Sequence, residues 1–86
     1  MPWCVDISRR AERDLDRLPI EDRNAVIGAL RRMADDLSSV DLRKLGGSAN
    51  RWRLRVGRWR VILDSDNQSG TMTAARVLDR RDAYRD

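Results

Sequence analysis

The stretch RWRLRVGRWRVILD, residues 51–64, decides the fold expected of this chain. Arginine and apolar side chains alternate along residues 51–56, the period of two that is typical of a strand with one buried face. Gly57 and Arg58 interrupt the alternation and fit a two-residue type II′ turn, which takes glycine at its first position. The stretch therefore predicts a β-hairpin.

The two-residue turn sets the register of the hairpin, because it pairs the residues that flank it. One face then carries apolar residues that pair as Val56 with Trp59, Leu54 with Val61 and Trp52 with Leu63. The other face carries the pairs Arg55 with Arg60, Arg53 with Ile62 and Arg51 with Asp64. We expect both tryptophans to pack in the core. We also expect the arginines to converge on one surface, although directly opposed like charges destabilise a sheet.

The residues before the hairpin predict a strand and two helices. A strand is expected over residues 3–7, which are rich in β-branched and aromatic side chains. Ser8 fits the N-cap of a first helix that Pro19 ends, and a second helix is expected to begin near Glu21 and Asp22. The apolar residues of the second helix follow the period of an amphipathic helix: Val26, Leu30, Met33 and Leu37.

The remaining segments complete a β-α-α-β-β-β order. Residues 38–50 contain the serines, glycines and asparagine of a loop, and residues 64–70 form a second turn. Residues 71–78 are expected to add another antiparallel strand, and residues 80–86 a turn or short helix. The predicted fold is α+β, with an antiparallel twisted sheet and the N-terminal helical hairpin packed on one face. We expect a single domain, 1–86.

Positive charge is concentrated in the middle of the chain. The whole chain has 18 basic and 14 acidic residues, whereas residues 42–63 contain seven basic residues and no acidic one. The remainder has 11 basic and 14 acidic residues, a net charge of −3. A local positive patch favours a polyanion-binding surface, with nucleic acid as the first candidate. Seventeen basic residues are arginine, which suits bidentate phosphate binding, although arginine-rich codon usage explains this ratio equally well.

The composition disfavours several functional classes. One cysteine and no histidine leave no set of zinc ligands, and Cys4 is expected to be a buried, unreactive thiol. We expect neither a metal nor another cofactor. No apolar run is long enough to span a membrane, and residues 1–10 lack the pattern of a signal peptide. The protein is therefore expected to be cytoplasmic, with no membrane partner.

Three segments carry a resemblance to a known family: KLGG at residues 44–47, WRLRVGRWRVIL at 52–63 and RVLDRRDAY at 76–84. With these segments the chain resembles the RelE/ParE superfamily of bacterial toxins from type II toxin–antitoxin systems, RelE more than ParE. The resemblance implies a RelE-like fold and a cognate antitoxin as partner, with operator DNA bound only through the antitoxin. RelE-like members cut mRNA in the ribosomal A site without a metal, whereas ParE-like members poison DNA gyrase and lack the nuclease residues.

The resemblance also implies roles for individual residues. Arg60 and Arg80 match phosphate-binding arginines, and Tyr84 matches a tyrosine that stacks on a base or assists proton transfer. Asp79 stands where the family often has histidine and is a candidate base. Lys44 matches a common family lysine, and burial among arginines would lower its pKa. The other RNA- or phosphate-binding candidates are Arg51, Arg53, Arg55 and Arg81.

Other interpretations of these residues stay open. Tyr84 also suits an anchor for the C-terminus, Arg58 a solvated turn residue, and Arg76 an ion pair with a carboxylate such as Asp64. The two phosphate-binding arginines also suit ion pairs with acidic neighbours.

The leading function is a ribosome-dependent mRNA endonuclease. In this mechanism the 2′-OH of the RNA attacks the adjacent phosphate, and arginines neutralise the charge that develops on its oxygens. The alternatives are a DNA gyrase inhibitor and a nucleic-acid-binding module without catalysis.

Overall fold

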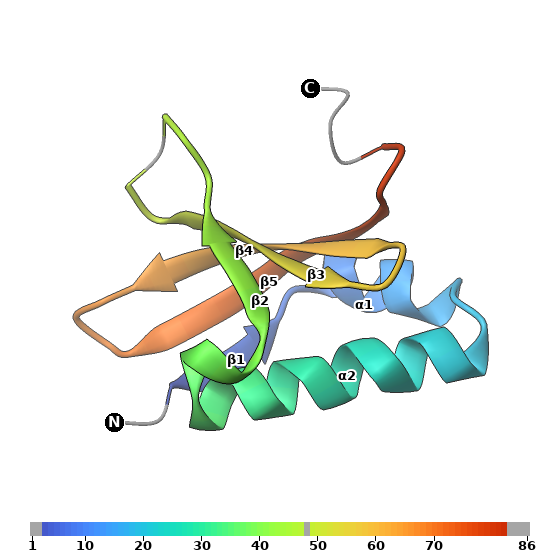
Figure 1. The fold of residues 1–86 in the computed structure, drawn as a ribbon, viewed down its shortest axis with the longest axis horizontal. Coiled ribbons are helices and arrows are strands. Elements are labelled where there is room, and N and C mark those ends of the chain that lie inside the picture. The colour runs from blue at the N-terminus through green and yellow to red at the C-terminus, as the bar shows by residue number, and fades with distance from the viewer. Residues whose placement is uncertain (1–2, 48, 83–86) are drawn as a thin grey trace.

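Two helices and a five-stranded sheet make up the chain in the computed structural model, which describes residues 3–47 and 49–82 (Figure 1). The helices are α1 (Arg9–Asp16) and α2 (Ile20–Asp35), and a short 3₁₀ helix, Leu37–Ser39, follows α2. The strands are β1 (Cys4–Ile7), β2 (Asp41–Lys44), β3 (Arg51–Val56), β4 (Trp59–Asp66) and β5 (Thr71–Asp79). They lie side by side in the order β1-β5-β4-β3-β2. The predicted α+β fold is confirmed.

The β3–β4 hairpin has the predicted register. Its six pairs run from Val56 opposite Trp59 at the turn to Arg51 opposite Asp64 at the far end. Gly57 has a φ of 58°, whereas the following Arg58 is outside the left-handed region, which is the pattern of a type II′ turn. Turn chemistry and the period of two were therefore sufficient to predict this pairing.

The two helices pack on one face of the sheet, α1 against β5 and α2 against β1 and β3 (Figure 1). Ser8 caps α1 as predicted, because its Oγ accepts a hydrogen bond from the Ala11 N–H at 3.1 Å. Leu37, expected at the end of the second helix, lies instead in the 3₁₀ turn after Asp35. Neither described helix is long and apolar enough to cross a membrane.

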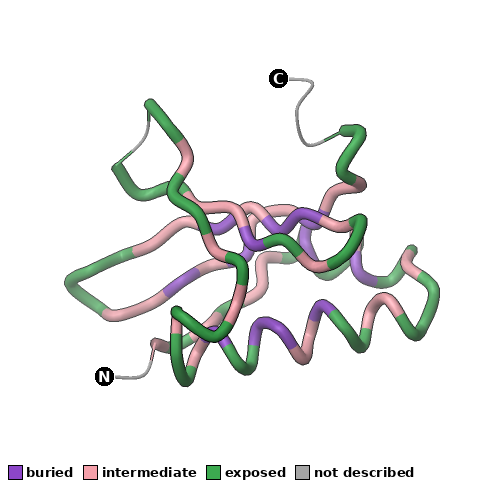
Figure 2. The backbone as a smooth tube through the Cα atoms, viewed as in Figure 1, coloured by how far each residue is buried: buried purple, intermediate pink, exposed green. Residues whose placement is uncertain are grey.

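The core lies between this helical layer and the sheet, and the buried stretches of α2 face the central strands in Figure 2. Trp52 and Trp59 pack against the core, as expected. The buried apolar residues come from both layers: Ala11, Leu15, Val26, Ala29, Leu30 and Met33 from the helices, and Leu54, Val61, Leu63, Met72, Ala74 and Val77 from the strands.

Two features of the sheet differ from the prediction. β1 runs parallel to β5, so the sheet is mixed rather than wholly antiparallel. Asp41–Lys44, expected within a loop, forms strand β2 and pairs with β3, where Leu42 lies opposite Leu54. This segment has one apolar residue and is too short for a period to be recognised. It becomes a strand because the outer edge of β3 offers backbone hydrogen-bonding groups.

The expectation of a buried cysteine is wrong. Cys4 is exposed at the first position of β1. Val5 and Ile7 pack against the core, and alternate residues of a strand point to opposite faces. Cys4 therefore lies on the outer face of the sheet.

Helix α1 covers the part of β5 that extends beyond β1. Ser8 donates hydrogen bonds from its N–H and its Oγ to two carbonyl groups of β5. The Asp14 carboxylate accepts from the Val77 N–H at 2.9 Å and from Arg76 Nε at 2.8 Å. An exposed strand edge would offer these groups to another chain. The ion pair with a carboxylate considered for Arg76 is formed with Asp14, whereas Asp64 bonds Arg51.

Candidate functional site

Five arginines share the side of the sheet opposite the helices. We call this set the arginine face: Arg43 of β2, Arg51, Arg53 and Arg55 of β3, and Arg60 of β4. Each of them is adjacent along its strand to at least one residue that packs against the core, so alternation directs the arginines to the outer side. The cross-strand register confirms that the three arginines of β3 and Arg60 lie on one face.

Carboxylates neutralise two members of the arginine face. Arg51 forms a two-bonded ion pair with Asp64, with Nε and Nη2 at 3.0 and 3.3 Å from the carboxylate oxygens. The hydrogen bond and the charge of Asp64 raise the pKa of Arg51. Arg43 Nε lies 3.7 Å from a carboxylate oxygen of Asp41. These two arginines are therefore less available for a phosphate than their position suggests.

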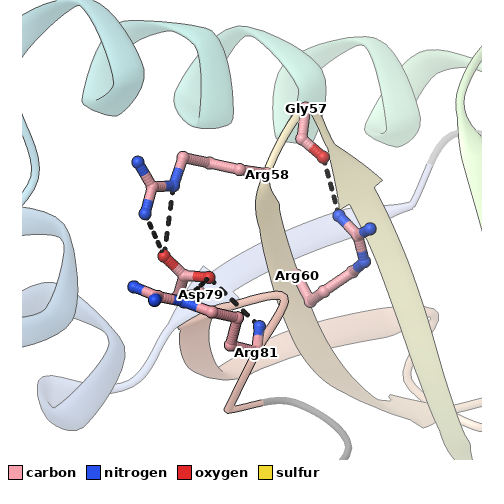
Figure 3. A network of polar contacts seen from close by, with 5 residues as sticks. All are labelled: Gly57, Arg58, Arg60, Asp79 and Arg81. Atoms are coloured by element: carbon pink, nitrogen blue, oxygen red, sulfur yellow. Dashed lines mark hydrogen bonds and ion pairs between the residues drawn. The ribbon is translucent and has the colours of Figure 1, made fainter.

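Arg55 and Arg60 are directly opposite each other, and no carboxylate of the described chain pairs with either. Arg55 is exposed. Arg60 is only 5% exposed, and its Nη1 donates to the carbonyl oxygens of Gly57 at 2.7 Å and Trp59 at 2.9 Å (Figure 3). Buried charges are normally paired. The pair therefore presents two positive charges without an ion-pair partner among the described residues, one buried and one exposed, although Asp41 of β2 lies opposite Arg55 on its other side.

A second group of arginines gathers around Asp79 at the hairpin turn. Arg58 donates to Asp79 from Nη2 and from Nε, the latter at 3.1 Å, and the Arg81 N–H donates to the same carboxylate at 3.1 Å (Figure 3). Arg81 Nε lies 3.7 Å from Asp79 Oδ1. The Arg80 N–H donates to the Arg58 carbonyl at 2.8 Å. We call these four residues the Asp79 cluster.

The Asp79 cluster and Arg60 occupy different sides of the sheet. Asp79 lies opposite Trp59, and Arg60 is the next residue along β4, so their side chains point in opposite directions. In Figure 3 the Arg60 side chain accordingly extends away from Asp79 toward Gly57. The tip of the hairpin lies between the two groups.

The structure separates both candidate bases from the Arg55–Arg60 pair. Hydrogen bonds from the Arg81 backbone and the Arg58 side chain lower the pKa of Asp79, which is therefore a weak base engaged in ion pairs. Lys44 pairs with Trp52 on the face that bears the helices, with Nζ 5.8 Å from the centre of the indole ring.

Tyr84, the third residue considered for proton transfer, lies outside the described residues, as does most of the expected C-terminal turn or helix. Arg80 and Arg81 are described. Both are exposed and follow directly after β5, at the same end of the sheet as the β3–β4 turn.

Sequence reasoning missed Arg58 as a site residue. A register shift at Ile62 and Leu63 leaves Ala75 without a partner and brings Asp79 opposite Trp59, next to Arg58. Without that β-bulge, the register set at the β4–β5 turn would place Asp79 opposite Arg58 itself, so the bulge shifts Asp79 by one residue. The signal in the sequence was an acidic residue at the end of the last strand, which the register counted from the β4–β5 turn would have placed beside Arg58.

The fold is that of the RelE toxins, and the predicted RelE-like resemblance is confirmed. A chain of the toxin–antitoxin complex RelBE2 from Mycobacterium tuberculosis is 26% identical, with a TM-score of 0.77 over 93% of this chain and 100% of that chain. A chain of the archaeal RelE–RelB complex from Pyrococcus horikoshii is 20% identical, with a TM-score of 0.79 over 93% of this chain and 97% of that chain. A mutant of the Escherichia coli toxin RelE in the free state is 17% identical, with a TM-score of 0.77 over 98% of this chain and 88% of that chain. No family model and no curated protein matches the sequence.

Proposed function

We propose that this chain is the toxin of a type II toxin–antitoxin system and acts in the cytoplasm as a ribosome-dependent mRNA endonuclease that inhibits translation. The observation that carries the proposal is the Arg55–Arg60 pair, in which neither arginine forms an ion pair with a carboxylate of the described chain, although Asp41 lies opposite Arg55 on β2. A phosphate group supplies the missing negative charge, and guanidinium groups bind it with directed hydrogen bonds. The likeness to RelE toxins supports the same class.

The reaction proposed needs no metal or other cofactor. The 2′-oxygen of the RNA attacks the adjacent phosphorus, the bond to the 5′-oxygen breaks, and a 2′,3′-cyclic phosphate and a free 5′-OH result. Arg55 offers exposed donors to the phosphoryl oxygens, and Arg60 adds a fixed positive charge beneath them. Arg53 lies next to Arg55 on the same face and completes the cationic surface.

Proton transfer is assigned to neither Asp79 nor Lys44. The pKa of Asp79 is lowered by the hydrogen bonds and charges of Arg58 and Arg81, so it holds no proton to donate and accepts one poorly at neutral pH. Lys44 lies on the opposite face of the sheet. We propose Tyr84 for this role, on the basis of the sequence resemblance alone.

A cognate antitoxin is the partner that we propose for this chain. Solved structures similar to it are toxin–antitoxin complexes from M. tuberculosis, Methanococcus jannaschii and P. horikoshii. The exposed charge of Arg55 suits an acidic segment of such a partner as well as RNA. Operator DNA would be bound through the antitoxin.

The test is expression of the chain without antitoxin, followed by toeprinting on translating ribosomes. We expect growth arrest and cleavage of mRNA at A-site codons. Arg55→Ala and Arg80→Ala should relieve both effects, and because both side chains are exposed these variants should stay folded. Arg60→Ala is a weaker choice, since it removes a buried side chain that bonds its own turn.

Arg13→Ala is the matched control, because Arg13 is an exposed arginine of α1, in the layer on the other side of the sheet. It should remain toxic. Folded Arg55→Ala and Arg80→Ala variants that arrest growth like the unchanged protein would refute the nuclease. Intact mRNA with accumulating double-strand DNA breaks would indicate gyrase as the target, an alternative that the similarity to RelE toxins does not favour.

A further inference from the structure

We infer that the Asp79 cluster binds a second backbone phosphate of the RNA, across the tip of the β3–β4 hairpin from the phosphate held by Arg55 and Arg60. This inference rests on the proposed function, but it concerns a different part of the surface. Arg58, Asp79, Arg80 and Arg81 line a hollow of about 300 Å³ at the end of the sheet. Three positive charges and one negative charge surround it.

Arg58 is an exposed turn residue, as expected, but its guanidinium has two partners and its backbone has a third. Its guanidinium carbon lies 5.3 Å from the centre of the Trp59 ring, and two of its nitrogens donate to Asp79. Its carbonyl accepts from the Arg80 N–H. Free arginine side chains lose about 2 kcal/mol of rotamer entropy when they are immobilised. In Arg58 much of this ordering has taken place before any ligand binds.

The guanidinium groups retain donors for an additional anion. An arginine has five N–H donors, and Asp79 accepts from two nitrogens of Arg58. The Arg58 and Arg81 side chains are 58% and 78% exposed, whereas Asp79 is 14% exposed. The carboxylate therefore lies beneath the arginines and draws them together, while their outer sides face solvent. Asp82 follows nearby and reduces the net charge, but leaves it positive.

The location suits a strand of RNA that crosses the tip of the hairpin. Arg58 belongs to the turn that joins β3 and β4, two residues from Arg60 and three from Arg55. A nucleotide chain bound to the arginine face and continuing past this turn reaches the Asp79 cluster next. The cluster holds the flanking phosphate and so keeps the reacting phosphate in line.

The test measures binding of a short 2′-O-methyl RNA oligonucleotide, which lacks the attacking hydroxyl, as a function of salt concentration. Each phosphate neutralised in a single strand contributes about 0.7 to the slope of log K against log salt. Arg58→Gln should reduce the slope by about 0.7. The double variant with Arg58→Gln and Arg81→Gln should show the same reduced slope as the single variant, because both side chains bind one phosphate. Arg58→Lys should largely restore it, and Arg13→Gln should leave it unchanged.

A double variant with the same slope as the unchanged protein would overturn the inference. A decrease of the slope by twice the expected amount would also overturn it, because it would mean that Arg58 and Arg81 bind separate phosphates. Absence of oligonucleotide binding by the unchanged protein at low salt would also overturn it. Toeprinting separates this result from the proposed function. If the unchanged protein cleaves mRNA but Arg58→Gln does not change the salt dependence of binding, only the second phosphate site is refuted. If Arg58→Gln reduces the slope but the unchanged protein does not cleave mRNA, only the nuclease proposal is refuted.

Discussion

Arg55 and Arg60 face each other across β3 and β4, and neither forms an ion pair with a carboxylate of residues 3–47 or 49–82. Directly opposed like charges destabilise a sheet by a fraction of a kcal/mol, up to about 1 kcal/mol. Nearby pairs such as Arg51 with Asp64 do not have this defect. An external anion is therefore expected to stabilise the folded protein at this point.

Sulfate or phosphate should raise the melting temperature, with chloride at equal ionic strength as the reference. An anion that binds only the folded state stabilises it by about 2.7 kcal/mol when present at 100 times its dissociation constant. Arg55→Gln should raise the melting temperature without anion by about 2–4 °C and remove much of the anion effect. Arg13→Gln serves as control. Equal sulfate responses of the two variants would contradict the prediction.

Asp14→Ala should destabilise the protein by about 1–3 kcal/mol, because the Val77 N–H and the Arg76 guanidinium lose their acceptor at the edge of β5. Urea unfolding measures this difference. Asp16→Ala is the control in the same helix: Asp16 is 70% exposed and 3.9 Å from Arg23, so its loss should change stability by less than about 0.5 kcal/mol. Similar losses in the two variants would show that the cap on β5 is unimportant.

Stability should decrease in acid through Asp14. Burial raises the pKa of this carboxyl, but hydrogen bonds from Arg76 and Val77 together outweigh burial and lower it. Its contribution is therefore complete above the unfolded-state pKa of about 3.9 and is lost as the pH falls through the folded-state value. Denaturant titrations at decreasing pH should show less loss in Asp14→Asn. An unchanged pH dependence in that variant would contradict the lowered pKa.

Gly57→Ala should destabilise the hairpin by about 1–2 kcal/mol, because Gly57 has a φ of 58°, which costs other residues energy. It should also disturb the Gly57 carbonyl that accepts from Arg60. Gly46→Ala is the control: its φ is ordinary and no atom lies within 4 Å of an added Cβ. The melting temperatures of both variants test this prediction, and equal decreases in the two would argue against the type II′ turn.

Local chemistry was enough to predict the helices and the central hairpin. Ser8 caps α1, the apolar period of α2 places Val26 and Met33 in the core, and the two-residue turn sets the register of β3 on β4. Each of these features depends on residues a few positions apart, so the chain encodes it within one segment. The four arginines of β3 and β4 on the arginine face followed from the same register, whereas Arg43 lies on β2, which was expected to be a loop.

The tertiary structure alone decided the features that join distant segments. Asp14 meets Arg76 and Val77 across more than 60 residues, β1 runs parallel to β5, and a bulge shifts β5 so that Asp79 lies opposite Trp59. Such contacts depend on how helices and strands pack together and on where a bulge inserts one extra residue into a strand. The local hydrophobic periodicity of the sequence indicates neither. The sequence by itself thus determined which residues share a strand face, and packing determined which charges are neutralised.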